Sequence, residues 1–326
     1  MMNVAPAIIA SKAHRARSAM NTAFQKYYAE GGQEKTSGLI TARYDILTAG
    51  GFTPDDSKFW NTFHLSFVLL DIEANSPFSC FVVGSFDAGM MLAASMNSNP
   101  AVFWLLSYIY SDPELLSDIR KEASSAVSVS GSKAKLDLSQ LLKRCPILTS
   151  CMQEMLRILD AFIGTRVVME DTLLNDQYLL RKDGIIQLVC GPMHLSSSIW
   201  GSDSHAFDPR RFLKSNQDNL SKDSRKAQKS GYNPFGGGAT LCPGRHFVTM
   251  EILGVLATIV VGYDITMQDG SPLKVLKPQK QAFAVQVKHV DGDLGVNIKR
   301  RDGWEGLEWI YDTGVGEVNS ASDLAF

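Results

Sequence analysis

Residues 235–245 read Phe-Gly-Gly-Gly-Ala-Thr-Leu-Cys-Pro-Gly-Arg, and this stretch decides how the rest of the chain is interpreted. Its glycines remove side chains from one approach to Cys242, which leaves room for a flat ligand. An apolar run follows Pro243, and proline favours the first turn of a helix, so the pattern predicts a helix over 243–262 with Cys242 at its N-cap. At that position the helix dipole and free backbone N–H groups favour a thiolate.

An open thiolate on a glycine-lined loop, with Phe235 beside it, suits an axial sulfur–iron bond of the kind that holds haem in some proteins. A phosphate loop fits less well, because it requires Gly-Lys-Ser/Thr where Cys242-Pro243-Gly244 stands. A nucleophilic cysteine requires a histidine and an orienting Asn or Asp, which spacing alone cannot reveal. A glycine-rich turn closed by a buried cysteine is the purely structural interpretation.

The pattern Phe-x-x-Gly-x-x-x-Cys-Pro-Gly-Arg resembles the haem-binding signature of the cytochrome P450 family. The resemblance implies haem b as the cofactor, Cys242 as the axial ligand of its iron, and Phe235 and Gly238 as cofactor-binding residues. The family usually has Arg or His two residues before the cysteine, where this chain has Thr240. The sequence Gly-Ala-Thr-x-Cys-Pro-Gly-Arg is most similar to the branch that contains sterol 7α-hydroxylases, and it leaves one cation fewer for a haem propionate.

Three further motifs resemble the same family. Glu154 and Arg157 share one face of a predicted helix, because residues i and i+3 are neighbours there. The segment Pro209-Arg210-Arg211-Phe212 resembles the family's Pro-x-Arg-Phe box, so the resemblance implies a buried structural network of Glu154, Arg157 and Arg211. Arg166 resembles the propionate-binding arginine. A solvated surface pair and a solvated strand-edge arginine are the alternatives.

Residues 93–104 resemble the segment of the family that faces bound dioxygen, in the branch of sterol hydroxylases and prostacyclin synthases. By position, Asn97 replaces the usual acid and Ser98 the usual alcohol. The Ser98 hydroxyl can donate a hydrogen bond, whereas the Asn97 amide cannot titrate. The resemblance therefore makes Ser98 and Asn97 the candidate catalytic residues and leaves oxygen-independent rearrangement of a peroxide as an alternative. Helix packing around a kink at Pro100 is the structural interpretation.

Periodicity and turn residues predict a mainly α-helical protein with a minor β-sheet (α+β). Predicted helices cover 6–30, 35–48, 78–110 with a kink at Pro100, 114–124, 146–160 and 243–262. Predicted strands cover 166–170, 178–181, 185–190, 283–289 and 295–299, the last two joined by a turn at Asp291-Gly292. The polar stretches 125–135 and 214–231 are predicted to be loops. His194 is predicted to be a satisfied structural histidine.

The composition excludes several classes of protein. The chain has 326 residues, a formal net charge of −2 and a hydrophobic share of 45%, which argues against disorder and against nucleic-acid binding. Five cysteines without a CxxC pair argue against a disulfide scaffold or a zinc site, so no metal besides haem iron is expected. The basic, acid-free start before Glu30 fits a solvated helix face better than a transit peptide. No segment is predicted to anchor the chain in a bilayer.

The resemblance covers about residues 78–301 and implies the C-terminal two-thirds of a P450 fold, so 1–326 is interpreted as one incomplete domain. It implies a haem-thiolate monooxygenase acting on an apolar small molecule such as a lipid, a sterol or a secondary metabolite. Electrons would come from NADPH through a flavoprotein, NADPH-cytochrome reductase, steered by the basic stretch 214–229. The resemblance implies the cytosolic face of the endoplasmic reticulum membrane, with the cytoplasm as alternative. A truncated relic that binds haem without turnover is the other alternative.

Overall fold

A computed structural model of the chain describes residues 95–280 and 286–313. The predicted helices 6–30 and 35–48, and the part of 78–110 before Ser95, lie outside these residues. The described α-helices are α6 Ser98–Ser111, α7 Pro113–Ser124, α8 Leu141–Arg144, α9 Pro146–Leu159, α10 Cys190–His194, α11 Ser197–Trp200, α12 Lys214–Asp218, α13 Lys222–Gly231 and α14 Arg245–Gly262. Two 3-10 turns, Leu138–Gln140 and Gly238–Thr240, complete the helical set of the described residues.

The strands are short and form several small sheets. Their bounds are β1 Val127–Ser130, β2 Lys133–Asp137, β3 Ile163–Val167, β4 Thr172–Leu174, β5 Tyr178–Leu180, β6 Ile185–Val189, β7 Tyr263–Met267, β8 Lys277–Pro278, β9 Val290–Asp291, β10 Val296–Arg300 and β11 Glu308–Asp312. One sheet has the order β1-β2-β11, and the pairs β3–β6, β4–β5, β7–β10 and β8–β9 are two-stranded. The prediction of a mainly helical protein with minor sheets is confirmed.

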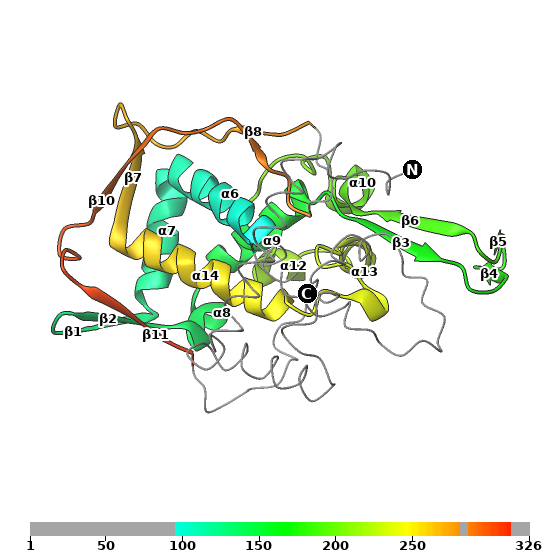
Figure 1. Cartoon of the computed structure of the whole chain (residues 1–326), viewed down its shortest axis with the longest axis horizontal. Coiled ribbons are helices and arrows are strands. Elements are labelled where there is room, and N and C mark those ends of the chain that lie inside the picture. The colour runs from blue at the N-terminus through cyan, green and yellow to red at the C-terminus, as the bar shows by residue number, and fades with distance from the viewer. Residues whose placement is uncertain (1–94, 281–285, 314–326) are drawn as a thin grey trace, which may run out of the picture. The chain divides into compact units, whose positions relative to one another are not determined.

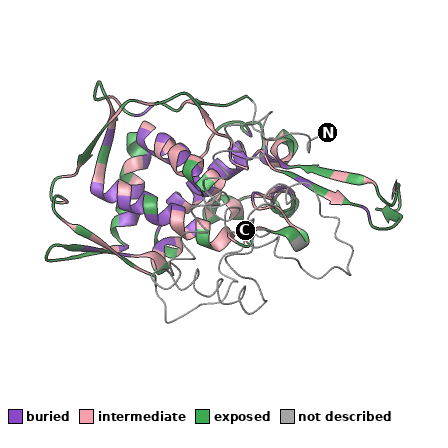
Figure 2. Cartoon of the chain, viewed as in Figure 1, coloured by how far each residue is buried: buried purple, intermediate pink, exposed green. Residues whose placement is uncertain are grey.

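The hydrophobic core lies between four helices, α6, α7, α9 and α14 (Figures 1 and 2). Each contributes fully buried side chains, among them Leu105, Ile119, Met155 and Leu253. The helix α14 is long and apolar enough to cross a membrane, but 56% of its most apolar stretch is buried inside the protein, so we interpret it as a core helix. Its lack of a polar face follows from burial on several sides.

Local sequence signals explain where the core helices begin. Asp112 caps α7, because its carboxylate accepts hydrogen bonds from the backbone N–H groups of Glu114 and Leu115 and Pro113 occupies the first helical position. Pro146 likewise stands at the first position of α9, but its N-cap, Cys145, makes no side-chain capping hydrogen bond. The predicted interruption near Pro100 is present: a turn at Asn97 separates residues 95–96 from α6, and Pro100 lies in the first turn of α6. A proline there lacks the N–H that would continue the preceding helix.

Three of the element predictions were wrong. Residues 125–135 contain the hairpin β1–β2, which turns at Gly131 with φ +57° and is extended by the distant strand β11. The stretch 214–231 holds α12 and α13, where Ser221 caps α13 and accepts a hydrogen bond from Ser224 N–H. The predicted hairpin around Asp291-Gly292 does not form: β10 pairs with β7, and of the predicted strand 283–289 the described part makes a single bridge, Val287 to Asp160.

The ribbon β3–β6 projects away from the helices and carries the β4–β5 pair at its far end (Figure 1). Its antiparallel register pairs Ile163 with Val189 and Val167 with Ile185, so these four side chains share one face. All four are exposed. Arg166 lies on the opposite face, because side chains alternate along a strand. The polar pair Thr165–Gln187 lies between these apolar pairs on the same face, and Arg166 lies on the other face.

Candidate functional site

The loop that carries Cys242 is closed by its own backbone. Cys242 N–H donates a hydrogen bond to the Phe235 carbonyl at 3.0 Å, and Gly236 N–H donates to the Asn233 carbonyl at 3.1 Å. The Arg245 guanidinium, in the first turn of α14, donates to the Cys242 carbonyl at 3.0 Å. Phe235 also packs against the hydrophobic core. Hydrogen bonds at both ends of the loop therefore hold the Cys242 backbone in place.

Glycines leave the surface of this loop open. Gly236 and Gly238 have φ angles of +76° and +64°, the left-handed region that favours glycine. A Cβ atom built at Gly238 would meet no heavy atom within 4 Å, and one at Gly237 would meet only Asn233 Oδ1, at 4.0 Å. At Gly237 and Gly238 the loop thus exposes bare backbone. Any other residue at these positions would place a Cβ atom in the space that a ligand could occupy.

Cys242 differs from the other described cysteines. Cys145, Cys151 and Cys190 are buried, and burial raises the pKa of Cys145 to about 12 and that of Cys190 to about 11. Cys242 is partly exposed. Thiols that must lose a proton in an apolar core are poor metal ligands. Cys242 is thus the described cysteine best placed to act as a thiolate.

The predicted N-cap position of Cys242 was wrong. The helix α14 begins at Arg245 and its N-cap is Gly244, so Pro243 lies in the preceding turn rather than in the helix. The cysteine therefore sits two residues before the cap, where the loop hydrogen bonds, and not a side-chain cap, determine its place. The argument from the helix dipole is weakened accordingly, since that effect falls off within the first turn.

These residues fit a haem. A thiol beside an open glycine surface matches the shape of a planar cofactor with a soft axial ligand. Cys242 would bind the iron, and Gly238 with Phe235 would line the macrocycle on the same side. Among the described residues, no group of three or more His, Cys, Asp or Glu side chains could hold a separate metal ion.

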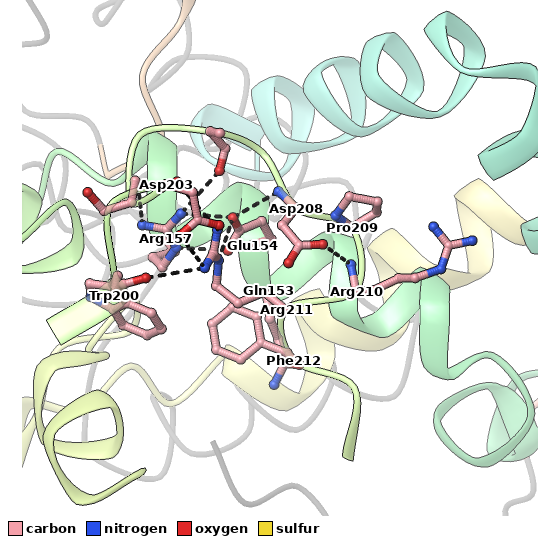
Figure 3. A network of polar contacts seen from close by, with 12 residues as sticks. Gln153, Glu154, Arg157, Trp200, Asp203, Asp208, Pro209, Arg210, Arg211 and Phe212 are labelled. Atoms are coloured by element: carbon pink, nitrogen blue, oxygen red, sulfur yellow. Dashed lines mark hydrogen bonds and ion pairs between the residues drawn. The ribbon is translucent and has the colours of Figure 1, made fainter. Parts of the chain in front are cut away.

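Glu154, Arg157 and Arg211 meet in one buried network, shown in Figure 3. Glu154 and Arg157 form a bidentate pair with both N–O distances at 2.8 Å, and Arg211 Nε donates to Glu154 Oε1 at 3.0 Å. The side chains of Glu154 and Arg157 are 0% exposed and that of Arg211 is 9% exposed. The structure thus brings the three residues of the predicted network together.

The remaining donors of the network are also satisfied. Arg157 Nη1 donates to the carbonyls of His194 and Ser204, both at 2.6 Å. Arg211 forms an ion pair of 2.8 Å with Asp203, and this pair holds the pKa of Asp203 below its usual range. Two arginines face two carboxylates, so burial leaves no unpaired charge, which is the condition under which a buried ion pair is tolerated.

Arg166 links the β3–β6 ribbon to the cysteine loop. It donates hydrogen bonds to the Gly237 carbonyl at 3.0 Å and to the Thr240 hydroxyl. Thr240 is the residue at which the chain departs from the usual motif, and its hydroxyl accepts from the arginine that was assigned to the propionate. The role of Arg166 in binding the cofactor stays a prediction.

Asn97 and Ser98 lie where α6 begins. The Asn97 side-chain oxygen accepts hydrogen bonds from the backbone N–H groups of Gln286 and Val287, at 3.0 and 3.4 Å. Ser98 is buried. Asn97 therefore joins α6 to the segment that follows residues 281–285, which gives it a structural use. The catalytic roles of both residues stay predictions.

Sequence reasoning missed three partners at this site. Asp203 pairs with Arg211, Asp160 pairs with His194, and the Asn233 backbone N–H donates to His194 Nε2 at 2.9 Å. His194 is buried, as predicted for a structural histidine, but only Nε2 makes a hydrogen bond. No local pattern pointed to Asp160, because it lies one residue beyond the end of α9 and its partner comes from α10.

Comparisons with known proteins show which family the chain matches. The family model that matches, over residues 85–291, is described as "Cytochrome P450". A "Cytochrome P450 monooxygenase" of Gibberella zeae is 31% identical over 71% of this chain and 46% of that protein. The "Cytochrome P450 monooxygenase nodJ" of Hypoxylon pulicicidum is 27% identical over 97% of this chain and 58% of that protein.

A third relative, the "Cholesterol 7-alpha-monooxygenase" of Cricetulus griseus, is 31% identical over 62% of this chain and 44% of that protein. It belongs to the branch that the Gly-Ala-Thr-x-Cys sequence resembles. The chain spans about half the length of the curated relatives it matches. The family model covers well over half of the chain and includes the network and Cys242. The chain therefore belongs to the cytochrome P450 family.

Proposed function

We propose that this chain carries the thiolate side of a haem monooxygenase that hydroxylates an apolar small molecule. Cys242 would be the axial ligand of the iron, dioxygen the oxidant, and NADPH the electron source through a flavoprotein reductase. Family membership and relatives named as monooxygenases support this function.

The observation that carries the proposal is the geometry of the cysteine loop. Cys242 is partly exposed on a loop whose glycines leave an open surface, while the loop backbone is held by bonds to Phe235 and Arg245. When bound, haem supplies the redox chemistry of the iron, and its thiolate ligand favours cleavage of the O–O bond. The protein contributes a ligand on a loop closed by its own backbone, and the buried Glu154 network separately joins α9 to the 200–212 segment.

The substrate is proposed to be apolar, in the class of sterols, other lipids or secondary metabolites. Two relatives carry names that specify a sterol substrate, a cholesterol 7-alpha-monooxygenase and a 7-alpha-hydroxycholest-4-en-3-one 12-alpha-hydroxylase. The helix assigned to the oxygen-activating side, α6, is rich in apolar side chains. Ser98 would supply a hydroxyl donor and Asn97 an amide near its start.

The reductase is proposed to approach over α12 and α13. These helices precede the cysteine loop and carry the basic residues of the 214–229 stretch: Lys214, Lys222, Arg225, Lys226 and Lys229. Their positive field would steer an acidic flavoprotein, an effect that high salt weakens. The cytosolic face of the endoplasmic reticulum membrane is the proposed location, where such a reductase would meet an apolar substrate.

The Soret band of the reduced carbon monoxide complex tests the thiolate directly. The full chain, reconstituted with haem, should show the red-shifted band of a thiolate-ligated iron, and Cys242→Ala should abolish the band. Cys190→Ala is the matched control, because it removes a buried thiol and should keep the band. A holoprotein with haem bound and an unshifted band would refute the proposal.

A second candidate function is oxygen-independent rearrangement of a peroxide. It is favoured by Asn97, whose amide cannot titrate and whose oxygen is already engaged by two backbone N–H groups. Product formation that depends strictly on NADPH and dioxygen would exclude it. A thiolate-type band without any turnover, with reductase present, would instead support a haem-binding protein that has lost activity.

A further inference from the structure

His194, the last residue of α10, is completely buried and has both ring nitrogens in contact with protein groups. Nε2 accepts a hydrogen bond of 2.9 Å from the backbone N–H of Asn233. Nδ1 lies 3.1 Å from Asp160 Oδ2, and both side chains are at most 1% exposed. The ring is therefore held by a hydrogen bond at Nε2, with a carboxylate oxygen close to Nδ1.

Of the two ring contacts, only the one at Nε2 is a hydrogen bond. A nitrogen that accepts a hydrogen bond carries no proton, so the proton of a neutral imidazole is on Nδ1, which lies 3.1 Å from Asp160 Oδ2 without a hydrogen bond to it. Asp160 is itself held in place, because its Oδ1 accepts from Phe162 N–H at 2.7 Å. Burial raises the pKa of Asp160, while the contact with His194 and the bond from Phe162 oppose that rise. The carboxylate is thus a fixed neighbour of Nδ1.

From Nε2 of the ring, a series of backbone contacts leads to the loop that carries Cys242. Asn233, whose N–H binds His194, offers its own carbonyl to Gly236 N–H at 3.1 Å. Two residues after Asn233, Phe235 accepts the hydrogen bond from Cys242 N–H at 3.0 Å. The His194 ring is therefore attached to the first residue of the hydrogen-bonded loop that ends at Cys242.

The same histidine is bound to α9 in two ways. Its backbone carbonyl accepts from Arg157 Nη1 at 2.6 Å, and its ring faces Asp160, one residue beyond the end of α9. Tyr232, next to Asn233, packs against the His194 ring, with 5.6 Å between the ring centroids. Its hydroxyl donates a hydrogen bond of 3.0 Å to the Gln153 carbonyl in α9. The cysteine loop is thus connected to the helix of the buried network through His194.

We propose that His194 is a positioning residue that holds the start of the Cys242 loop through the Asn233 N–H. The inference rests on the proposed function of Cys242 as a haem ligand. Its content is specific: the acceptor at Nε2 positions the loop, and the Asp160 carboxylate, 3.1 Å from Nδ1, favours the ring proton on that nitrogen. A histidine with only a packing role would not require the acceptor at Nε2.

Two substitutions separate the nitrogens. In His194→Gln the side-chain oxygen reaches the place of Nε2 and can still accept from Asn233, whereas in His194→Asn the shorter amide reaches the place of Nδ1 and leaves Asn233 N–H without its acceptor. Both variants keep the backbone carbonyl that binds Arg157 and lose similar ring packing. They form a matched pair for the loop contact alone.

Hydrogen exchange in the haem-free full chain is the first measurement. Loss of one buried hydrogen bond should raise amide exchange over residues 232–242 about tenfold in His194→Asn, with His194→Gln close to the unmodified chain. The second measurement is the share of haem that gives the red-shifted carbon monoxide band, which should fall in His194→Asn and be retained in His194→Gln. Equal behaviour of the two variants in both measurements would overturn the inference.

Two controls distinguish a failure of this inference from a failure of the proposed function. If the unmodified chain binds haem without a thiolate-type band, the proposed function fails, while the exchange comparison still decides the role of His194. If His194→Asn does not fold, Asp160→Asn replaces it, because an amide at this position no longer favours the proton on Nδ1. Exchange over 232–242 should then rise above that of the unmodified chain, and an unchanged rate would count against the inference.

Discussion

The Glu154 network and the β3–β6 ribbon reverse the usual distribution of polar and apolar side chains. The network buries Glu154, Arg157 and Arg211 almost completely, whereas one face of the ribbon exposes Ile163, Val167, Ile185 and Val189 by 46% to 69% (Figure 2). Charges are tolerated inside because each has a partner of opposite sign and further hydrogen bonds. On the ribbon these apolar side chains stay exposed, and the polar pair Thr165–Gln187 lies between them. In these two regions, the burial of a side chain depends more on whether it has hydrogen-bonding or ionic partners than on how hydrophobic it is.

Breaking the network should have the largest effect. Glu154→Ala removes the acceptor that both arginines share and leaves the buried Arg157 without a carboxylate partner, while Arg211 keeps Asp203, so the free energy of unfolding should fall by about 3–5 kcal/mol. Urea denaturation followed by circular dichroism measures this change. The control is Asp118→Ala, which breaks the neighbouring but exposed pair with Arg210 and should cost about 1 kcal/mol or less. Equal losses in the two variants would show that burial of the network does not matter.

The same substitution made in the hydrophobic core and at the far end of the ribbon sharpens the comparison. Leu256→Ala, at a fully buried position of α14, should destabilise the protein by about 2–5 kcal/mol, because it leaves a cavity. Leu173→Ala, at a position of β4 that is 56% exposed, should change stability by about 0.5 kcal/mol or less. The shift in melting temperature compares the two. A large loss at Leu173 would mean that the ribbon end is buried against something in solution.

The smallest expected effect concerns the rim of the network, where Asp203 pairs with Arg211. The folded-state pKa of Asp203 lies below its unfolded value, so its contribution is present above about pH 4 and is lost as the pH falls through the folded pKa. The stability difference between the unmodified chain and Asp203→Asn should therefore shrink from pH 7 toward pH 3. The Asp203 side chain is 57% exposed, so the difference is small even at pH 7. A difference that grows on acidification would contradict this pairing.

Patterns that are local in the sequence predicted the structure well. The helix α9 begins at the predicted Pro146, and Glu154 and Arg157 meet because three residues separate them on that helix. The contact with Arg211 was expected only from a resemblance, since nothing in composition or periodicity links residues so far apart. The core helix α14 was recognisable from its apolar length, although Cys242 is not its N-cap.

Features that depend on distant partners could not be predicted. The strand β2 has a polar sequence, and β11 covers its second edge from the other end of the described chain. The helix α13 is highly polar, so its sequence shows no apolar periodicity. Its inward face is evident only in the structure, where Gln228 and Gly231 are buried. The contact of Arg166 with Thr240 joins two segments that the sequence separates by 74 positions. In each case the partner that decides the outcome lies outside any local window.

The parallel pairing of β2 with β11 has a consequence for synthesis of the chain. Ala134 lies opposite Trp309, and Trp104 Nε1 donates a hydrogen bond to the Lys288 carbonyl, 184 positions away. Such contacts cannot form on the ribosome until nearly the whole chain has emerged, whereas α6, α7 and α9 are complete much earlier. Contacts between distant segments slow folding, because the intervening chain must be ordered first. Until β11 has been synthesised, β2 has an open edge, and aggregation can begin at such an edge.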